Sequence, residues 1–407
     1  MNVKKIKGKY NTAIAYAGVI EDKAINQIKQ LCDQEFAKGS KIRVMPDVHA
    51  GKGCTIGTTM TITDKVVPNI VGVDIGCGML TTKLNVSEID FAKFDEAAHF
   101  VPSGHNVWNE KKQDFDLKRL ACYDELINVS RIENSVGTLG GGNHFIEIDQ
   151  DSNGAYYLVI HTGSRNLGKQ VAEIYQRRAV ALNRAKNANH EEKCASLVRE
   201  YKKAGRAREI PAALNRLEQK RKAGFIPENL CYVYGKEFEN YLRDAQICQE
   251  FARQNRELIA KILLERAGLE AIESFHTIHN YIDAKEMILR KGAIAAHKGE
   301  RVLIPINMRD GSILALGKGD ERWNYSAPHG AGRIMSRGSA RKKLSLHDYK
   351  DAMRGIYSTT VNEKTLDEAP FAYKKLEDII DDIKGAVDVL EILKPVYNFK
   401  SDEETVS

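Results

Sequence analysis

Short polar motifs rich in glycine recur in the first and last thirds of this chain, and most follow an apolar stretch. In GVDIGCGM (residues 72–79), which follows KVVPNIV, the motif places a carboxylate at Asp74 and a thiol at Cys77. Glycines around these two side chains indicate a tight turn after the apolar segment. The other motifs are MPDVHAGKG (45–53), GGGNHFIE (140–147), VIHTGSR (159–165), FHTIHNY (275–281) and APHGAGR (327–333). Because similar motifs occur in both thirds, we predict that these parts of the chain share one site.

The segment between the two sets of motifs has a different pattern. Residues 167–222 are basic and predicted helical, and apolar residues recur at helical spacing after Pro227. Short β-branched segments between glycines indicate strands in residues 1–100 and 275–335. We therefore predict a mixed α/β (α+β) fold with a single domain over residues 1–400, in which strands surround a central cleft. We expect a mainly helical, basic insertion at about residues 167–270. We expect a loose acidic tail at residues 401–407.

The net charge of +6 is unevenly distributed. Residues Arg165–Lys222 contain 16 Lys or Arg, 6 Glu and no Asp, a net charge of +10, so the rest of the chain carries −4. Such a segment suits a polyanion such as RNA, and we expect its helices to lie near the site. A solvated helical surface is the alternative interpretation.

The composition places the chain among soluble globular proteins, with 43% apolar and 29% charged residues. Seven scattered cysteines, an odd number, do not indicate a disulfide framework. Because no long apolar segment is present, we predict neither a signal peptide nor a membrane span. A cytoplasmic location is the resulting prediction.

The polar motifs together offer the side chains that bind a borderline divalent cation, namely carboxylate, thiolate and imidazole. A single histidine after a strand is more often a hydrogen-bonded core residue, but the joint occurrence of several motifs favours a metal site. A structural zinc site would normally show CxxC pairs, and this sequence has none. We therefore predict a catalytic site in which the sulfur of Cys77 bridges two cations and Asp74 holds one of them.

Longer stretches of the sequence resemble the RtcB family of GTP-dependent RNA ligases. They are MPDVHAGKGCTIGTT, GVDIGCGM, GTLGGGNHFIEI, HTGSRNLG, HNY, RKGAI, PHGAGRIMSR and YKKLEDI, which follow in family order from about Met45 to Lys400. The resemblance implies an enzyme with two Mn²⁺ ions and GTP in its central cleft. It would join RNA ends bearing a 2′,3′-cyclic phosphate or 3′-phosphate to 5′-hydroxyl ends through an RNA-ppG intermediate, in RNA repair or tRNA splicing.

The resemblance also implies roles for individual residues. Cys77 would bridge both ions, Asp74 and His144 would complete one metal site, and His161 and His279 the other. His329 would become guanylylated, with Asp47 orienting its ring. The residues implied to contact the nucleotide are Asn143, Glu147, Asn280, His329, Gly330, Ala331, Gly332 and Lys400, of which Glu147 and Lys400 would read guanine. Our candidates for RNA contact are Arg165, Arg206, Arg208, Arg216 and Arg333.

Two segments depart from the family pattern. PINMRDGS (305–312) replaces a Gly-Ser-Met-Gly type of loop near Asn307, and AHKGE (296–300) replaces ARAGQ, with His297 in the place of arginine. Both changes bear on contacts with GTP and RNA. Two other hypotheses are a dinuclear metal phosphoesterase that acts on RNA ends, and a non-catalytic RNA-binding repair factor. The first would not need Glu147, Lys400 or the His329 loop, and the second would bind RNA without metal.

Overall fold

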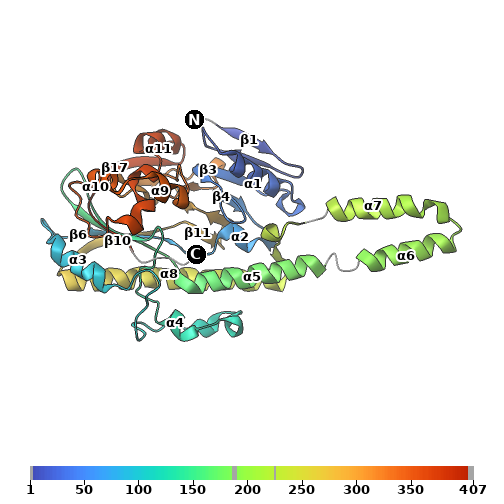
Figure 1. Ribbon diagram of the computed structural model, residues 1–407, viewed down its shortest axis with the longest axis horizontal. Helices are drawn as coiled ribbons and strands as arrows, with labels where there is room; N and C mark the ends of the chain where they lie inside the picture. The colour runs from blue at the N-terminus through green and yellow to red at the C-terminus, as the bar shows by residue number, and fades with distance from the viewer. Residues whose placement is uncertain (1–2, 186–189, 224–225, 402–407) are drawn as a thin grey trace.

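The computed structural model describes residues 3–185, 190–223 and 226–401. The acidic tail predicted for residues 401–407 therefore lies, apart from Ser401, outside the described residues. Figure 1 shows a body built from sheets and helices, from which a helical arm projects along the longest axis of the molecule. The mixed α/β character predicted from the sequence is confirmed.

One sheet of the body has seven antiparallel strands. They are β6 (Gly78–Leu84), β7 (Phe145–Gln150), β8 (Tyr156–Thr162), β10 (Ala271–Ile278), β14 (Arg301–Asn307), β15 (Gly311–Gly317) and β17 (Val387–Phe399). Their order in the sheet is β10-β6-β8-β7-β17-β15-β14, so strands that are far apart in the sequence are neighbours. This order brings four of the polar motifs, those around Cys77, His144, His161 and His279, to one sheet.

A second sheet has six strands. They are β1 (Lys4–Lys7), β2 (Thr12–Ala15), β3 (Ile42–His49), β4 (Ile56–Thr61), β11 (Asn280–Asp283) and β12 (Ile288–Lys291), in the order β1-β2-β3-β4-β12-β11. Only β2 and β3 run parallel. Two short strand pairs join the remaining strands, β5 (Lys65–Val66) with β9 (Val233–Tyr234) and β13 (Ala293–Ala295) with β16 (Ser326–Pro328).

The register of three neighbouring strands explains why their polar motifs meet. Gly78, the first residue of β6, pairs with Thr162 at the end of β8 and with Ile278 at the end of β10. Cys77, His161 and His279 are next to these three residues in the chain, so they lie at the same edge of the sheet. Phe145, the first residue of β7, pairs with His161 and adds His144 to the same edge.

Helices cover the sheets and form the arm. They are α1 (Asp22–Cys32), α2 (Pro68–Val71), α3 (Phe91–Phe100), α4 (Val129–Glu133), α5 (Arg165–Ala185), α6 (His190–Lys203), α7 (Ile210–Ala223), α8 (Lys236–Ala267), α9 (Arg337–Lys343), α10 (Leu346–Ala352) and α11 (Leu376–Ile383). The long helices α5 and α8 pack against each other along one side of the body (Figure 1). Their apolar faces join the largest core cluster, which includes Val171, Tyr175, Tyr241 and Phe251.

The helices α6 and α7 form the arm, together with the 3-10 turn Ala207–Glu209 between them. They contact mainly each other, and Figure 1 shows them extending away from both sheets. The expectation that the basic segment lies near the site is therefore wrong for these helices. The reason is that their apolar residues, among them the buried Ala213, are used in the contact between the two helices. Among the described residues of the arm, these apolar side chains are therefore not available to hold it against the body.

Two further findings concern the chain as a whole. All seven cysteines lie in the described residues, and none of them forms a disulfide bond. Within the described ranges, no helix combines the length and the apolar character that crossing a bilayer requires.

Candidate active site

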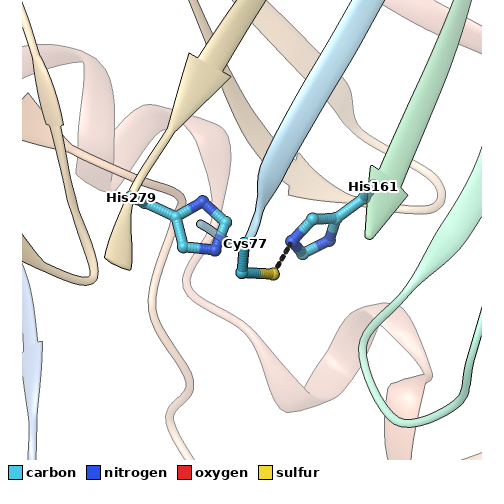
Figure 2. A group of neighbouring side chains, drawn as sticks. All are labelled: Cys77, His161 and His279. Carbon is cyan, nitrogen blue, oxygen red and sulfur yellow. Dashed lines mark hydrogen bonds between the residues drawn. The ribbon is translucent and has the colours of Figure 1, made fainter. Parts of the chain in front are cut away.

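The sulfur of Cys77 lies at the centre of the predicted metal site. It is 3.4 Å from Nε2 of His161 and 3.5 Å from Nε2 of His144. Figure 2 shows the rings of His161 and His279 on either side of the sulfur. His161 belongs to β8, and His279 lies between β10 and β11. The backbone N–H of His279 donates to the carbonyl oxygen of Cys77 at 2.9 Å, which fixes the two segments relative to each other.

The side chains around Cys77 form two groups that could each hold a metal ion. One consists of Cys77, His161 and His279, and the other of Asp74, Cys77 and His144. Within each group the ligand atoms lie within 4.8 Å of one another. Cys77 belongs to both groups, as the predicted bridging role requires.

The hydrogen bonds of His144 indicate that a cation belongs between it and Asp74. Its Nδ1 lies 2.9 Å from the carbonyl oxygen of Leu139, which can only accept, so Nδ1 carries the proton. Nε2 therefore presents a lone pair, and it faces Oδ2 of Asp74 at 3.1 Å. Two acceptors at this distance repel each other unless a cation or a proton lies between them. The residues present thus fit a divalent metal.

A glycine lets Asp74 reach its position. A Cβ atom at Gly163 would lie 2.2 Å from Oδ1 of Asp74, so any other residue would displace the carboxylate. The next backbone N–H, that of Ser164, donates to the same oxygen at 3.1 Å. The GS dipeptide of the VIHTGSR motif is therefore part of the Asp74 site.

The protonation states suit metal ligands. Burial holds the pKa of both His161 and His279 well below the usual value, so both imidazoles are neutral and keep a lone pair. Burial tends to raise the pKa of Asp74, but the contact with His144 and the positive charge of Arg165 lower it below the usual value overall. Burial and the charge of Asp74 raise the pKa of the Cys77 thiol. A bound divalent cation reverses this effect, because it deprotonates a coordinating thiol.

His329 and Asp47 form a second arrangement beside the metal ligands. Nδ1 of His329 lies 2.6 Å from Oδ2 of the fully buried Asp47, and the backbone N–H of His329 donates to the same oxygen at 3.2 Å. Nδ1 therefore carries a proton, and Nε2 keeps the lone pair. The ring of His329 is 4.8 Å from that of His279, measured between centroids. The arrangement suits a histidine nucleophile next to a metal centre.

A turn with glycines brings His329 to Asp47. Gly332 has a φ of +78°, and a Cβ atom there would lie 2.7 Å from the carbonyl oxygen of Asp47. The close approach of the HGAGR turn to β3 thus requires glycine at this position.

One cavity of about 340 Å³ connects four of the predicted metal ligands (Asp74, Cys77, His161 and His279), His329 and the predicted nucleotide contacts. All residues implied to contact the nucleotide line it: Asn143, Glu147, Asn280, His329, Gly330, Ala331, Gly332 and Lys400. Oε2 of Glu147 accepts a hydrogen bond from Nδ2 of Asn398 at 2.5 Å. The sequence analysis missed Phe145, Tyr373 and Asn398, which line the same cavity.

The sequence analysis also missed an acidic residue, Glu368, in the wall of this cavity. It is 3% exposed and accepts from Nζ of Lys400 at 2.9 Å and from the hydroxyl of Tyr373 at 2.8 Å. The guanidinium groups of Arg333 and Arg337 lie at 3.1 and 2.8 Å. Glu368 thus holds Lys400 and two arginines in place around one end of the cavity.

The structure brings few of the predicted RNA contacts to the cavity. Arg333 lines it, but its guanidinium donates to Glu368, to the Tyr373 hydroxyl and to the Asp367 carbonyl. Arg165 donates to the Thr138 hydroxyl and to the Gly104 carbonyl, and it does not line the cavity. The remaining three candidates, Arg206, Arg208 and Arg216, are exposed on the arm.

The two segments that depart from the family pattern lie in different places. Asn307 lines the cavity, but its side chain closes its own turn, with Oδ1 accepting from the backbone N–H groups of Arg309 and Asp310. His297 lies outside the cavity in a third group of possible ligands, with Asp283 and Glu286. The guanidinium of Arg290 is 3.9 and 3.8 Å from these two carboxylates and supplies a positive charge. We assign no metal there.

Comparisons with known proteins show which proteins this chain is similar to. The model of the family described as tRNA-splicing ligase RtcB matches residues 27–126 and 123–401. The RNA-splicing ligase RtcB of Escherichia coli (strain K12) is 28% identical, over 88% of this chain and 90% of its own length. The tRNA-splicing ligase RtcB of Aeropyrum pernix is also 28% identical, over 88% and 87%. The RNA-splicing ligase RtcB2 of Escherichia coli (strain ATCC 25922) is 23% identical, over 94% and 93%.

Proposed function

Because this chain belongs to the RtcB family of RNA-splicing ligases, we propose that it joins RNA ends with GTP and two Mn²⁺ ions as cofactors. Its substrates would be a 2′,3′-cyclic phosphate or 3′-phosphate end and a 5′-hydroxyl end, in RNA repair or tRNA splicing. One observation carries the proposal: a single cavity runs from the Cys77 group past His329 to Glu147 and Lys400. A nucleotide in this cavity could contact all three regions at once.

Two Mn²⁺ ions would be held by the two ligand groups that share Cys77. When bound, they would neutralise charge that develops on phosphoryl oxygens and on the leaving group. The neutral imidazoles of His161 and His279 and the carboxylate of Asp74 are in the protonation states that such ligands need.

His329 would act as the nucleophile toward GTP. Its Nε2 lone pair attacks the α-phosphorus, a P–N bond forms, and the bond to the β-phosphate oxygen breaks to release pyrophosphate. Asp47 keeps the proton on Nδ1 and stabilises the positive charge that the ring gains. Asn143 and Asn280, which line the cavity, would contact phosphate groups.

Glu147 and Lys400 would select guanine. Guanine presents its N1–H and 2-amino group as donors, which a buried carboxylate at Glu147 can accept. The ammonium of Lys400, held by Glu368, can donate to an acceptor on the base. Both side chains are nearly completely buried, so a base that leaves their remaining hydrogen-bonding capacity unused is disfavoured.

The RNA steps follow from the guanylylated histidine. An oxygen of the RNA 3′-phosphate attacks the phosphorus of the GMP group, the P–N bond breaks, and RNA-ppG forms while His329 is released. The 5′-hydroxyl oxygen of the other RNA then attacks the RNA phosphorus, and GMP leaves as the phosphodiester forms. A cyclic phosphate must first be opened by water.

The two rival hypotheses account for less of the site. A phosphoesterase would use the metal ligands but gives no role to the His329–Asp47 pair or to Glu147. A non-catalytic RNA-binding factor gives no role to any of these groups. No specific observation favours either one.

Labelling with GTP tests the proposal. The protein is incubated with α-³²P-labelled GTP and Mn²⁺, and the label should be attached through an acid-labile P–N bond. His329→Ala should abolish both labelling and ligation, whereas the exposed His347→Ala should leave both unchanged. Circular dichroism verifies that each variant is folded. Label that remains on His329→Ala would overturn the assignment.

A further inference from the structure

The positive charge of the arm is concentrated at its tip, which we define as residues 199–209. This segment, REYKKAGRARE, contains five Lys or Arg and two Glu, a net charge of +3 in 11 residues. It includes the end of α6 and the 3-10 turn that leads to α7. Figure 1 places this turn at the far end of the arm, at the extreme of the longest axis of the molecule.

Most of these cations are available to a partner. Arg206 is paired with Glu209 at 2.6 Å and lies over the ring of Tyr201. The other four, Arg199, Lys202, Lys203 and Arg208, are exposed and have no ion-pair partner among the described residues. If these residues only kept the arm soluble, we would expect positive and negative side chains to be mixed on its surface.

Three cations near the end of α6 share one face of the helix. Arg199, Lys202 and Lys203 are spaced i, i+3 and i+4, so they project from the same side. Val198, just before Arg199, and Tyr201, just before Lys202, are half-buried. The basic face is thus directed away from the contact between α6 and α7 and toward solvent.

The distance from the active site determines what kind of RNA could reach the tip. The helix α5 begins beside Asp74, to which Ser164 donates, and its 21 residues extend about 30 Å away from the site. The 14 residues of α6 add about 20 Å in a similar direction, as Figure 1 shows. The tip therefore lies about 50 Å from the metal ligands, the length of a duplex of roughly 15 base pairs.

We propose that the arm tip is a second RNA-binding surface, which grips the backbone of a duplex region in an RNA whose broken end occupies the active site. The surface would select structured RNA over short single-stranded fragments. It would do so through backbone contacts, because lysine and arginine on an exposed helix contact phosphates without reading sequence. This inference rests on the proposed function for the identity of the end that is joined.

A binding experiment tests the arm separately from the chemistry. The tip variant is Lys202→Gln/Lys203→Gln/Arg208→Gln, which leaves the Arg206–Glu209 pair intact. The control variant is Lys23→Gln/Lys29→Gln/Lys38→Gln, which removes the same charge from exposed positions of the body. Fluorescence anisotropy measures the affinity of each protein at several salt concentrations. The probes are a 20-base-pair stem-loop with a 3′-phosphate and a single-stranded hexamer with the same end.

The tip variant should bind the stem-loop about tenfold or more weakly at 0.1 M salt. Its log–log salt slope should be flatter by about 2 to 3, since each duplex phosphate contact contributes roughly −0.9. The affinity of the tip variant for the hexamer should fall by less than twofold relative to the wild type. The control variant should bind both probes as the wild type does.

Three outcomes would overturn the inference: an unchanged slope with the stem-loop, an equal loss in the control variant, or an equal loss with the hexamer. Guanylylation by labelled GTP is measured in parallel on all proteins. If the wild type takes no label, the proposed function fails, while the anisotropy still decides whether the tip binds RNA.

Discussion

Replacement of Glu368 by glutamine is the sharpest test of how the cavity is held together. The carboxylate is 3% exposed and lies within 3.1 Å of cationic groups on Lys400, Arg333 and Arg337. Glutamine preserves the shape but removes the charge, which leaves these cations without their shared anion. Removing one partner from a buried ion pair is strongly destabilising, because the remaining charge is desolvated without compensation.

The pKa of Glu368 gives the magnitude. Burial alone would raise this pKa, but the charges of Lys400, Arg337 and Arg333 lower it from the usual 4.5 to about 2. A decrease of about 2.5 units, at about 1.4 kcal/mol per unit, corresponds to about 3 kcal/mol of folding stability. Because the pKa is lowered in the folded state, this stability is fully present above pH 4.5. It is lost as the pH falls toward 2.

Urea unfolding at two pH values measures this effect. At pH 7, Glu368→Gln should lower the free energy of unfolding by about 3 kcal/mol, and at pH 3 by about half as much. The exposed Glu363→Gln, in the same 3-10 helix, should change it by less than about 0.5 kcal/mol. A loss below about 1 kcal/mol at pH 7, or one that does not depend on pH, would refute the assignment of a charge-bearing role to Glu368.

Two further predictions concern the reacting groups. Cys77→Ala should remove both Mn²⁺ ions, as measured by elemental analysis after gel filtration. The control Cys194→Ala, at a half-buried cysteine, should retain two ions per chain. Two ions in Cys77→Ala would contradict the bridging role. Asp47→Asn should slow guanylylation by roughly 10² to 10⁴-fold, because the ring of His329 then loses the carboxylate that fixes its tautomer. The affinity for GTP should stay within about threefold of the wild type, and an unchanged rate would show that Asp47 does not orient the nucleophile.

The sequence predicted well which polar residues come together around Cys77, because these residues occur in short motifs with a distinct chemistry. Asp74 and Cys77 flank a turn, and His161 and His279 directly adjoin paired strand ends, so strand register brings them together.

Residues that act through buried charge were not predictable in the same way. Glu368 lies in TLDEAPFAYK, which has no glycine and no strand before it. Arg256 is another such residue, on the buried face of α8. The apolar stripe of this helix is interrupted by two neighbouring polar residues, Asn255 and Arg256. That interruption was the available signal, since a polar pair on a buried helix face must have partners inside the protein.

The direction of the arm could not be predicted from charge. The count of +10 over Arg165–Lys222 is correct for the sequence, but it combines a helix that packs on the body with two that do not. A helix packs on the body only if its apolar face is not already used in another contact. In α6 and α7 those faces are used in the contact with each other.

The helices that support the arm are also anchored at the metal site. Ser164, directly before α5, donates to Asp74, and on α8 the guanidinium of Arg256 donates to the carbonyl oxygens of Gly76 and Thr162 at 2.8 and 2.9 Å. Arg256 is 1% exposed, and burial lowers its pKa to about 10, so it remains a cation beside the acidic and thiol ligands. The ligand loops are thus held from both helices through hydrogen bonds and charge. Because α5 and α8 pack along their length, the base of the arm has a fixed position relative to the reacting groups. An RNA held at the tip would therefore have its end presented to the cavity at a distance that the protein sets.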